Sequence, residues 1–115
     1  MMTKQEAFKY ACNKIDNQII PNCCWFKIGK TGDAPKDRFN QPDYAGCKGL
    51  TLLCSSDSST ISELEKALIN RYINNHLCGN IKGGNASLGD NMTSEYDKYH
   101  VYVVWKENRN FLRNR

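Results

Sequence analysis

Apolar side chains recur along this chain in two periods, and three stretches have the pattern of a β-strand. Residues 99–105 carry the strongest pattern, because nearly all of them are β-branched or aromatic. His100 and Tyr102 share one face of that stretch, and the opposite, valine-bearing face should meet the core. In residues 24–28, Cys24, Phe26 and Ile28 alternate with Trp25 and Lys27, which is the period of a half-buried strand. Residues 50–54 form a continuous apolar run that is typical of a central strand.

Two further stretches have a helical period, and each begins at a capping box, a threonine followed three residues later by a glutamate. The box at 60–63 predicts a helix over residues 61–75. The box at 3–6 predicts an N-terminal helix that ends near residue 17 and packs on the sheet, followed by a short strand at 19–20. The apolar stripe of the later helix comprises Ile61, Leu64, Leu68, Ile69, Tyr72 and Ile73.

One carboxylate interrupts this stripe. Glu65 falls between Tyr72 and Ile69 on the face that should be buried. An ionised carboxylate on a buried face is costly unless it is paired or binds a metal ion. Two interpretations follow: a salt bridge with a neighbouring lysine or arginine, or a metal ligand.

Residues 25–38 are interpreted as a strand, a glycine turn and a short helix. Gly29 and Gly32 allow a sharp turn or a close approach to a phosphate, Asp33 is a candidate N-cap, and Pro35 suits the first turn of a helix. We expect this local geometry to bring three cations together, which favours an anion site over a surface hairpin with solvated charges. These cations are Lys27, Lys30 and Arg38.

Together these pieces resemble the GIY-YIG nuclease domain, in the branch whose second motif is Lys-Ile-Gly. The resemblance rests on Lys27-Ile28-Gly29-Lys30-Thr31, on Arg38 in the next helix, and on Glu65 within Leu64-Glu65-Lys66-Ala67-Leu68-Ile69. It covers about half of the chain, residues 23–75. It implies an α+β domain with a small, mainly antiparallel sheet of three to four strands flanked by helices. It also implies a metal-dependent endonuclease that hydrolyses phosphodiester bonds.

The resemblance implies a role for each of these residues. Glu65 would bind one divalent cation, Mg²⁺ or another, since Mg²⁺ sites take one or two carboxylates and keep several waters. Arg38 would hold the scissile phosphate and offset its developing charge. Lys27 and Lys30 would bind phosphate or support activation of the attacking water, and a tyrosine would accept a proton.

Residues 76–98 form a glycine- and asparagine-rich loop, and a loop of this length in a small domain is usually functional or mobile. The resemblance implies an asparagine that helps to shape the site shortly after the glutamate helix. Asn85 is the first candidate and Asn80 the second. The alternative is a solvated loop amide.

The sequence departs from the family's pattern at the first motif. Gly-Ile-Tyr should precede Trp25, but residues 17–22 contain neither Gly nor Tyr. We predict that Tyr102 takes the place of this tyrosine in space, with strand 99–105 paired beside the Lys27 strand as in a circular permutation. The alternative is an edge strand whose Tyr102 packs beside a helix, with Tyr44 or a lysine as the activating group.

The 115 residues suffice for one domain with a single core. Its parts are an N-terminal helix addition (1–22), the motif-bearing core (23–75), the loop (76–98), the strand (99–105) and a basic tail (106–115). The net charge is +4, and the tail contains four basic residues and one acidic residue. Arg109 and Arg113 in this tail are candidates for contacts with a phosphate backbone, unless the tail is a solvated end or a short amphipathic helix.

No apolar run approaches the roughly 20 residues of a membrane helix, and the N-terminus lacks a signal-peptide core. We therefore expect a cytoplasmic protein without disulfides, although it has six cysteines. No pair of cysteines shows the C-x-x-C spacing. A composite zinc site is a weaker alternative. It would use Cys47, Cys54, Cys78 and His76.

The expected partner is nucleic acid, with DNA as the first choice, and the leading function is the endonuclease. A competing hypothesis is a non-catalytic nucleic-acid-binding module on the same scaffold. The missing Gly-Ile-Tyr favours the module. Glu65 argues against it, because pure DNA binding gains nothing from a carboxylate beside phosphate.

Overall fold

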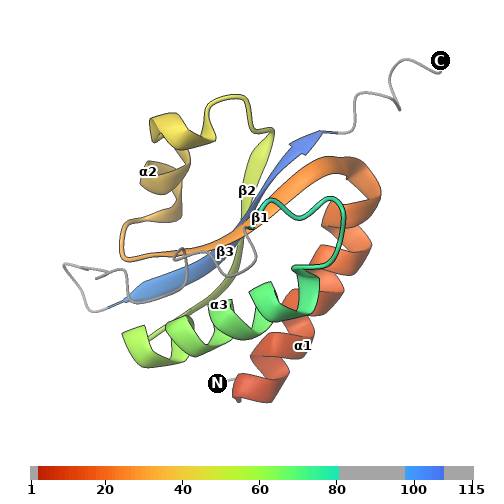
Figure 1. Ribbon diagram of the computed structural model, residues 1–115. Helices are drawn as coiled ribbons and strands as arrows, with labels where there is room; N and C mark the ends of the chain where they lie inside the picture. Colours follow the sequence, from red (N-terminus) through yellow and green to blue (C-terminus); the bar gives the residue numbers. More distant parts are fainter. Residues whose placement is uncertain (1–2, 81–97, 108–115) are drawn as a thin grey trace.

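The structure, a computed structural model, describes residues 3–80 and 98–107, which form three helices and three strands joined by shorter helical turns (Figure 1). Among these residues, no helix is both long and apolar enough to cross a bilayer. In chain order the elements are α1 (Lys4–Lys14), a π-helical turn (Ile15–Ile19), a 3₁₀ turn (Ile20–Asn22), β1 (Cys23–Thr31), α2 (Pro35–Phe39), a second 3₁₀ turn (Pro42–Tyr44), β2 (Gly49–Ser56), α3 (Ser58–Tyr72) and β3 (Tyr99–Glu107).

The three strands form one antiparallel sheet in the order β1-β3-β2, so the strand nearest the C-terminus is the central one. The predicted α+β class with a small antiparallel sheet is confirmed. The prediction that residues 50–54 form the central strand is wrong, because β2 lies at an edge. The consecutive residues Val101, Tyr102, Val103 and Val104 of β3 are all buried, as expected for a strand covered on both faces and paired on both sides.

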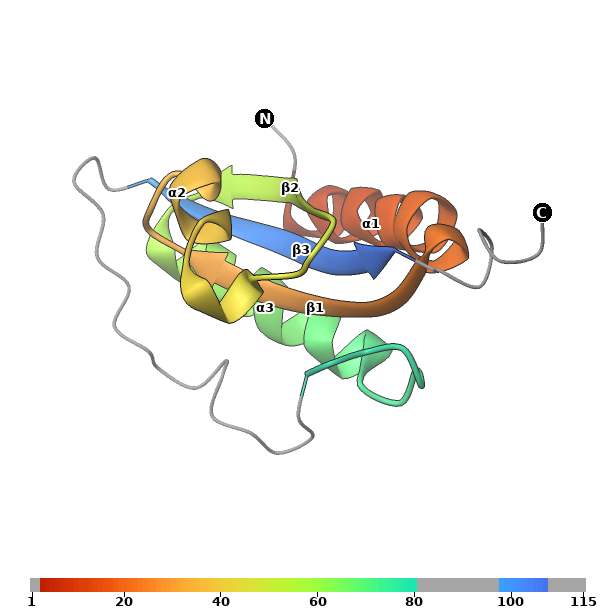
Figure 2. The same cartoon turned by 90° about the horizontal axis from the view of Figure 1, so that it is seen from above.

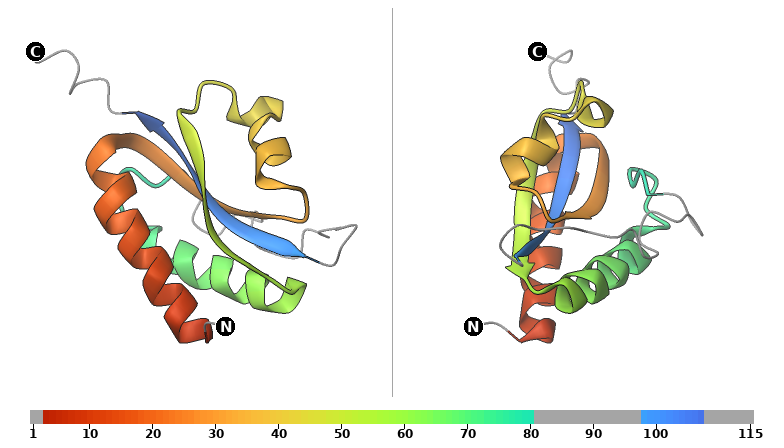
Figure 3. Two further views of the ribbon diagram at one scale, coloured as in Figure 1. Left: turned by 180° about the vertical axis from the view of Figure 1, so that it is seen from behind. Right: turned by 90° about the vertical axis from the view of Figure 1, so that its left-hand side faces the viewer.

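Helices α1 and α3 cover one face of the sheet, as two views of the ribbon show (Figures 1 and 3). Phe26 and Ile28 of β1 and Val101 and Val103 of β3 meet the helices there, and all four side chains are buried. The predicted stripe of α3 is confirmed for five of its six residues, and Glu65 is buried within it with 1 % of its surface exposed. The helix ends at Tyr72 instead of residue 75, so Ile73 lies just beyond it and is partly buried.

The short helix α2 and the 3₁₀ turn Pro42–Tyr44 cover the opposite face, where Figure 2 shows α2 in front of the strands and α3 behind them. A second, smaller apolar cluster forms there around Tyr44, Tyr102 and Val104. Trp25, Phe39, Cys47 and Leu50 pack against it and are partly buried. The sheet therefore has one apolar cluster on each face, the larger one beneath α1 and α3 and the smaller one beneath α2.

Several predicted boundaries are wrong for local reasons. The α3 helix begins at Ser58, because Asp57 is the N-cap and its side chain accepts a hydrogen bond from the Thr60 N–H. The predicted strand at 19–20 is helical, since the chain after α1 continues through two helical turns to Asn22. Asp33 does not cap α2. Ala34 precedes that helix without a side-chain cap, and Pro35 is its first residue as expected.

The segment after α3 covers the outer edge of β1. The Phe26 N–H donates to the Leu77 carbonyl at 3.0 Å, and the Gly79 N–H donates to the Phe26 carbonyl at 2.6 Å. The side-chain amide of Asn80 then makes the two hydrogen bonds that the backbone of a neighbouring strand would make. Its Oδ1 accepts from the Ile28 N–H and its Nδ2 donates to the Ile28 carbonyl, both at 2.9 Å. The outward backbone groups of Phe26 and Ile28 are thereby satisfied on this edge strand.

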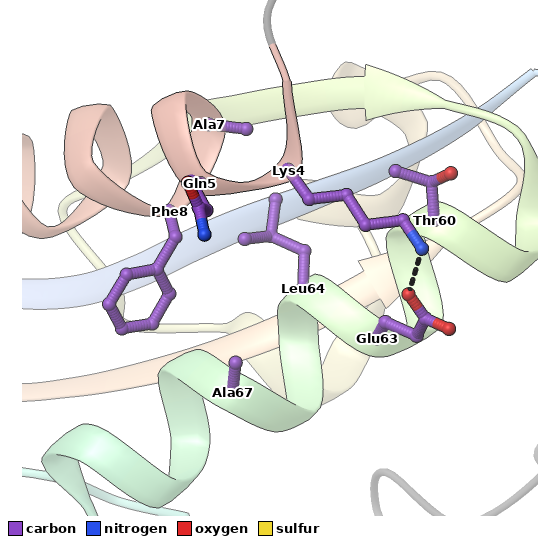
Figure 4. A pocket seen from close by; sticks show the side chains of 8 residues that line it. All are labelled: Lys4, Gln5, Ala7, Phe8, Thr60, Glu63, Leu64 and Ala67. Atoms are coloured by element: carbon purple, nitrogen blue, oxygen red, sulfur yellow. Dashed lines mark hydrogen bonds and ion pairs between the residues drawn. The ribbon is translucent and has the colours of Figure 1, made fainter.

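A groove of about 310 Å³ lies between α1 and α3, away from the face that α2 covers (Figure 4). Its floor is apolar, with Phe8, Leu64 and Ala67 among the lining residues. An ion pair between Lys4 and Glu63 spans the two helices beside it. The groove contains no candidate residue from the sequence, so we place the functional site elsewhere.

Replacing Asn80 by alanine should lower the free energy of unfolding by about 2 kcal/mol, because the buried N–H and carbonyl of Ile28 lose their partners. Urea denaturation followed by circular dichroism measures this loss. Asn74→Ala is the matched control, since Asn74 is exposed, and it should change stability little. Equal stability of the two variants would contradict the edge-covering role of Asn80.

Candidate functional site

Arg38 is the centre of a charged cluster between α2 and the 3₁₀ turn. Its guanidinium forms a two-pronged pair with Asp43, with Nη1–Oδ1 at 2.9 Å and Nη2–Oδ2 at 2.8 Å. Nη1 also donates to Gln41 Oε1 at 2.7 Å. The pairing raises the pKa of Arg38 and holds the pKa of Asp43 below its usual range. The short helix thus presents a fixed cation with a carboxylate already bound to it.

Two buried tyrosines continue this cluster towards the sheet. Arg38 lies 4.3 Å from the centre of the Tyr44 ring and donates from Nη2 to the Tyr44 hydroxyl at 3.3 Å. The hydroxyls of Tyr44 and Tyr102 are 2.5 Å apart. Burial raises the pKa of both phenols, while Arg38 opposes that rise. Their mutual hydrogen bond lowers the pKa of Tyr44 and raises that of Tyr102. Because Arg38 donates directly to the Tyr44 hydroxyl, Tyr44 is the better placed of the two to lose a proton.

Tyr102 lies across Gly29, the glycine of the Lys-Ile-Gly motif. The two residues are directly paired between β1 and β3, so they share one face of the sheet. A Cβ atom on Gly29 would overlap the Tyr102 hydroxyl oxygen, which excludes any larger residue in this arrangement. The predicted pairing of 99–105 beside the Lys27 strand is confirmed. The alternative of an edge strand is wrong, because β3 also pairs with β2.

Lys30 and Glu65 meet on the other face, beneath α3. The Lys30 ammonium is 4.0 Å from Glu65 Oε1 and donates to Ser62 Oγ at 3.2 Å. Both side chains are almost fully buried, with 5 % of Lys30 and 2 % of Glu65 exposed. The interpretation of Glu65 as a salt-bridge partner is confirmed by this pair, and a role as a metal ligand stays a prediction.

The predicted convergence of three cations is wrong for Lys30, whereas Lys27 and Arg38 lie on the same face of the sheet. The sequence suggested a turn at Gly29, but β1 runs through Gly29 to Thr31 because β3 pairs with it over that length. Residues three apart in a continuous strand point to opposite faces. Lys27 therefore shares a face with Tyr102, and its charge helps to lower the pKa of Asp43.

The two clusters adjoin at Gly29. On one face its missing side chain lets the Tyr102 hydroxyl approach the strand closely. The next residue, Lys30, extends from the other face to Glu65. The Arg38 cluster and the Glu65 pair therefore belong to neighbouring positions of one strand, separated by the thickness of the sheet.

Other candidates differ in where they lie. Asn85, Arg109 and Arg113 are outside the described residues, so their roles stay predictions. Asn80, the second choice for the site-shaping asparagine, holds the backbone of Ile28 beside Gly29. Asp43 was not predicted. Its only sequence signal is a Pro-Asp pair a few residues after Arg38, and such pairs are common in loops that hold no functional residue.

Among residues 3–80 and 98–107, no group of three or more His, Cys, Asp or Glu side chains is placed to hold a metal ion. The alternative zinc site is therefore not assembled, and its three cysteines are free thiols. Glu65 supplies the kind of ligand that Mg²⁺ takes, because Mg²⁺ accepts a single protein carboxylate and fills its remaining positions with water and phosphate oxygens. Its side chain is only 2 % exposed, so it would have to open to solvent before the ion and its waters could bind. An ion at Glu65 would have to share the carboxylate with the Lys30 ammonium.

Comparisons of the chain with protein-family models, curated proteins and solved structures found no match.

Replacing Gly29 by alanine should lower the free energy of unfolding by about 2 kcal/mol, because the new methyl group would overlap the Tyr102 hydroxyl. Gly49→Ala is the matched control on the other edge strand, where a Cβ would have its nearest contact at 3.3 Å. Urea denaturation of both variants measures the difference. A Gly29→Ala protein as stable as Gly49→Ala would show that Tyr102 does not lie against Gly29.

Proposed function

We propose that this chain is a metal-dependent endonuclease of the GIY-YIG type whose sheet is circularly permuted. One observation carries the proposal: Tyr102, from the last strand, lies across the glycine of Lys-Ile-Gly and touches the Arg38–Tyr44 cluster. In this proposal Tyr102 takes the place in space of the tyrosine that is missing before Trp25. The pairing of β3 with β1 would place this tyrosine beside Lys-Ile-Gly, although the two segments are in the reverse of the family's order along the chain.

Arg38 is suited to hold a phosphate diester. A guanidinium fork matches two phosphate oxygens, and a cation fixed before the reaction stabilises charge that develops during it. Contacts with Tyr44 and Gln41 keep Arg38 in place independently of Asp43. Lys27 adds a second positive charge on the same face.

Tyr44 is the better proton acceptor of the two tyrosines, and Tyr102 is its hydrogen-bond partner. Arg38 contacts the Tyr44 hydroxyl directly and favours its phenolate. Tyr102 then donates to that phenolate, which agrees with the opposite effects of the shared hydrogen bond on the two pKa values. This assignment changes the role that the resemblance implies for Tyr102 from proton acceptor to donor.

Glu65 is the residue that would hold Mg²⁺. When bound, the ion would supply Lewis-acid stabilisation of a phosphate's negative charge from the α3 side of β1, opposite to Arg38. Lys30 fixes the position of the carboxylate through the ion pair, and Ser62 fixes Lys30. The protein itself therefore holds the Glu65 carboxylate beside β1, the strand in which Gly29 pairs with Tyr102.

A non-catalytic nucleic-acid-binding module is the second candidate. The pairing of Glu65 with Lys30 favours it, because an ion pair in the core also explains a buried carboxylate without any metal. The two candidates differ in whether Glu65 is needed for a reaction or only for the fold.

A plasmid-nicking assay with Mg²⁺ tests the proposal. Arg38→Ala should lower the cleavage rate by about 100-fold or more, because it removes the cation proposed to hold the phosphate. Glu65→Gln should lower it as much, because it removes the carboxylate proposed to hold Mg²⁺ on the α3 side of β1. Lys66→Ala, on the exposed side of α3, is the matched control and should cleave like the wild type. Circular dichroism checks that each variant is folded.

Wild-type protein that binds DNA but never nicks it would establish the non-catalytic module instead. Full activity of a folded Glu65→Gln variant would assign Glu65 to the Lys30 ion pair alone.

The pH dependence of cleavage tests the role of Tyr44. Because its pKa is raised, only a small fraction is phenolate near neutral pH, and that fraction grows about tenfold per pH unit below the pKa. The rate should therefore rise from pH 7 to pH 9. Tyr44→Phe should lower the rate by about 100-fold and flatten the profile, while Tyr102→Phe should keep its slope. A profile unchanged in Tyr44→Phe would assign proton acceptance to another group.

A further inference from the structure

We infer that Asp43 occupies the phosphate site of Arg38 and that nucleic acid must displace it to bind. This inference rests on the proposed function, in which Arg38 receives a phosphate. Asp43 would then act as an internal competitor, an autoinhibitory contact within the loop that follows α2. The ligand that competes with it is a phosphate diester of a nucleic-acid backbone.

The geometry of the pair is the geometry that a phosphate would adopt. Both carboxylate oxygens of Asp43 accept from the terminal nitrogens of Arg38, at 2.9 and 2.8 Å. Arginine binds carboxylate and phosphate through the same planar fork. Because Gln41 takes a further bond from Nη1 and Tyr44 one from Nη2, a phosphate gains the fork only when Asp43 leaves.

The exposure of the two partners favours this exchange. The Asp43 side chain is 53 % exposed, whereas that of Arg38 is 18 % exposed. The carboxylate therefore lies on the solvent side, and the guanidinium lies beneath it against the Tyr44 ring at 4.3 Å. Water reaches the Asp43 carboxylate directly, so this carboxylate is rehydrated when the pair opens, while Arg38 remains in place against the Tyr44 ring.

The charges around the pair favour a polyanion as the competitor. Lys27 also acts on Asp43, so one carboxylate faces two cations on this surface. When Asp43 turns away, both cations are left to the incoming ligand. A nucleic-acid backbone carries successive phosphates and is able to meet both cations at once, which a single inorganic phosphate does less well.

Binding of a fluorescein-labelled DNA duplex, followed by anisotropy in EDTA so that no cleavage occurs, tests the inference. Asp43→Asn keeps the shape of the side chain but cannot neutralise Arg38, and it should bind about tenfold more tightly than the wild type. Asp37→Asn is the matched control, because Asp37 is an exposed acid in α2 and its removal changes the net charge equally. It should change affinity by no more than about twofold.

A double variant separates release of Arg38 from a general charge effect. When Arg38 is already replaced by alanine, adding Asp43→Asn should no longer tighten DNA binding, because the guanidinium fork that Asp43 blocks is absent. Asp43→Ala should tighten DNA binding as Asp43→Asn does, which shows that the gain comes from loss of the carboxylate and not from the new amide. Circular dichroism of each variant confirms that it is folded.

Equal affinities of Asp43→Asn and Asp37→Asn would overturn the inference, as would a gain that persists without Arg38. Absence of DNA binding in both the wild type and Asp43→Asn would also overturn it. Tighter binding by Asp43→Asn together with no nicking by any variant would support Asp43 as the competitor and reject the proposed hydrolysis, so the two proposals fail separately.

Discussion

Antiparallel hydrogen bonding of β3 to β1 on one side and to β2 on the other joins segments that are far apart in the sequence. Without β3, the strands β1 and β2 would have no common partner, because they do not pair with each other. The four consecutive buried residues of β3 contribute to the apolar clusters on both faces of the sheet. The candidate site depends on this strand, because β3 carries Tyr102 and holds β1, which carries Lys27 and Lys30.

The same pairing determines how the site is divided. Because β1 stays extended through Gly29, it carries Lys27 to the tyrosine face and Lys30 to the α3 face. At Gly29, between these two lysines, the Tyr102 hydroxyl occupies the space that a side chain would take. A small residue at this point is therefore a packing requirement.

Two carboxylates in the site are each paired with a cation of the protein. Arg38 is neutralised by Asp43, and Lys30 lies beside Glu65. The two pairs differ in exposure, because the carboxylate of Asp43 reaches solvent while that of Glu65 is buried. An incoming anion therefore competes with an accessible carboxylate at Arg38, whereas an incoming cation at Glu65 competes with a buried ammonium.

The sequence by itself determined the local structure: the extended stretch around Tyr102, the helical stripe with Glu65 inside it, and the short helix that carries Arg38. These features depend on side-chain period and on residues within about one helical turn, both of which are visible in a linear pattern. Only the tertiary structure decided which strand is central, which face each lysine reaches, and that Asp43 closes on Arg38. Those outcomes depend on which strands pair and in what register, and no local period specifies a partner many residues away.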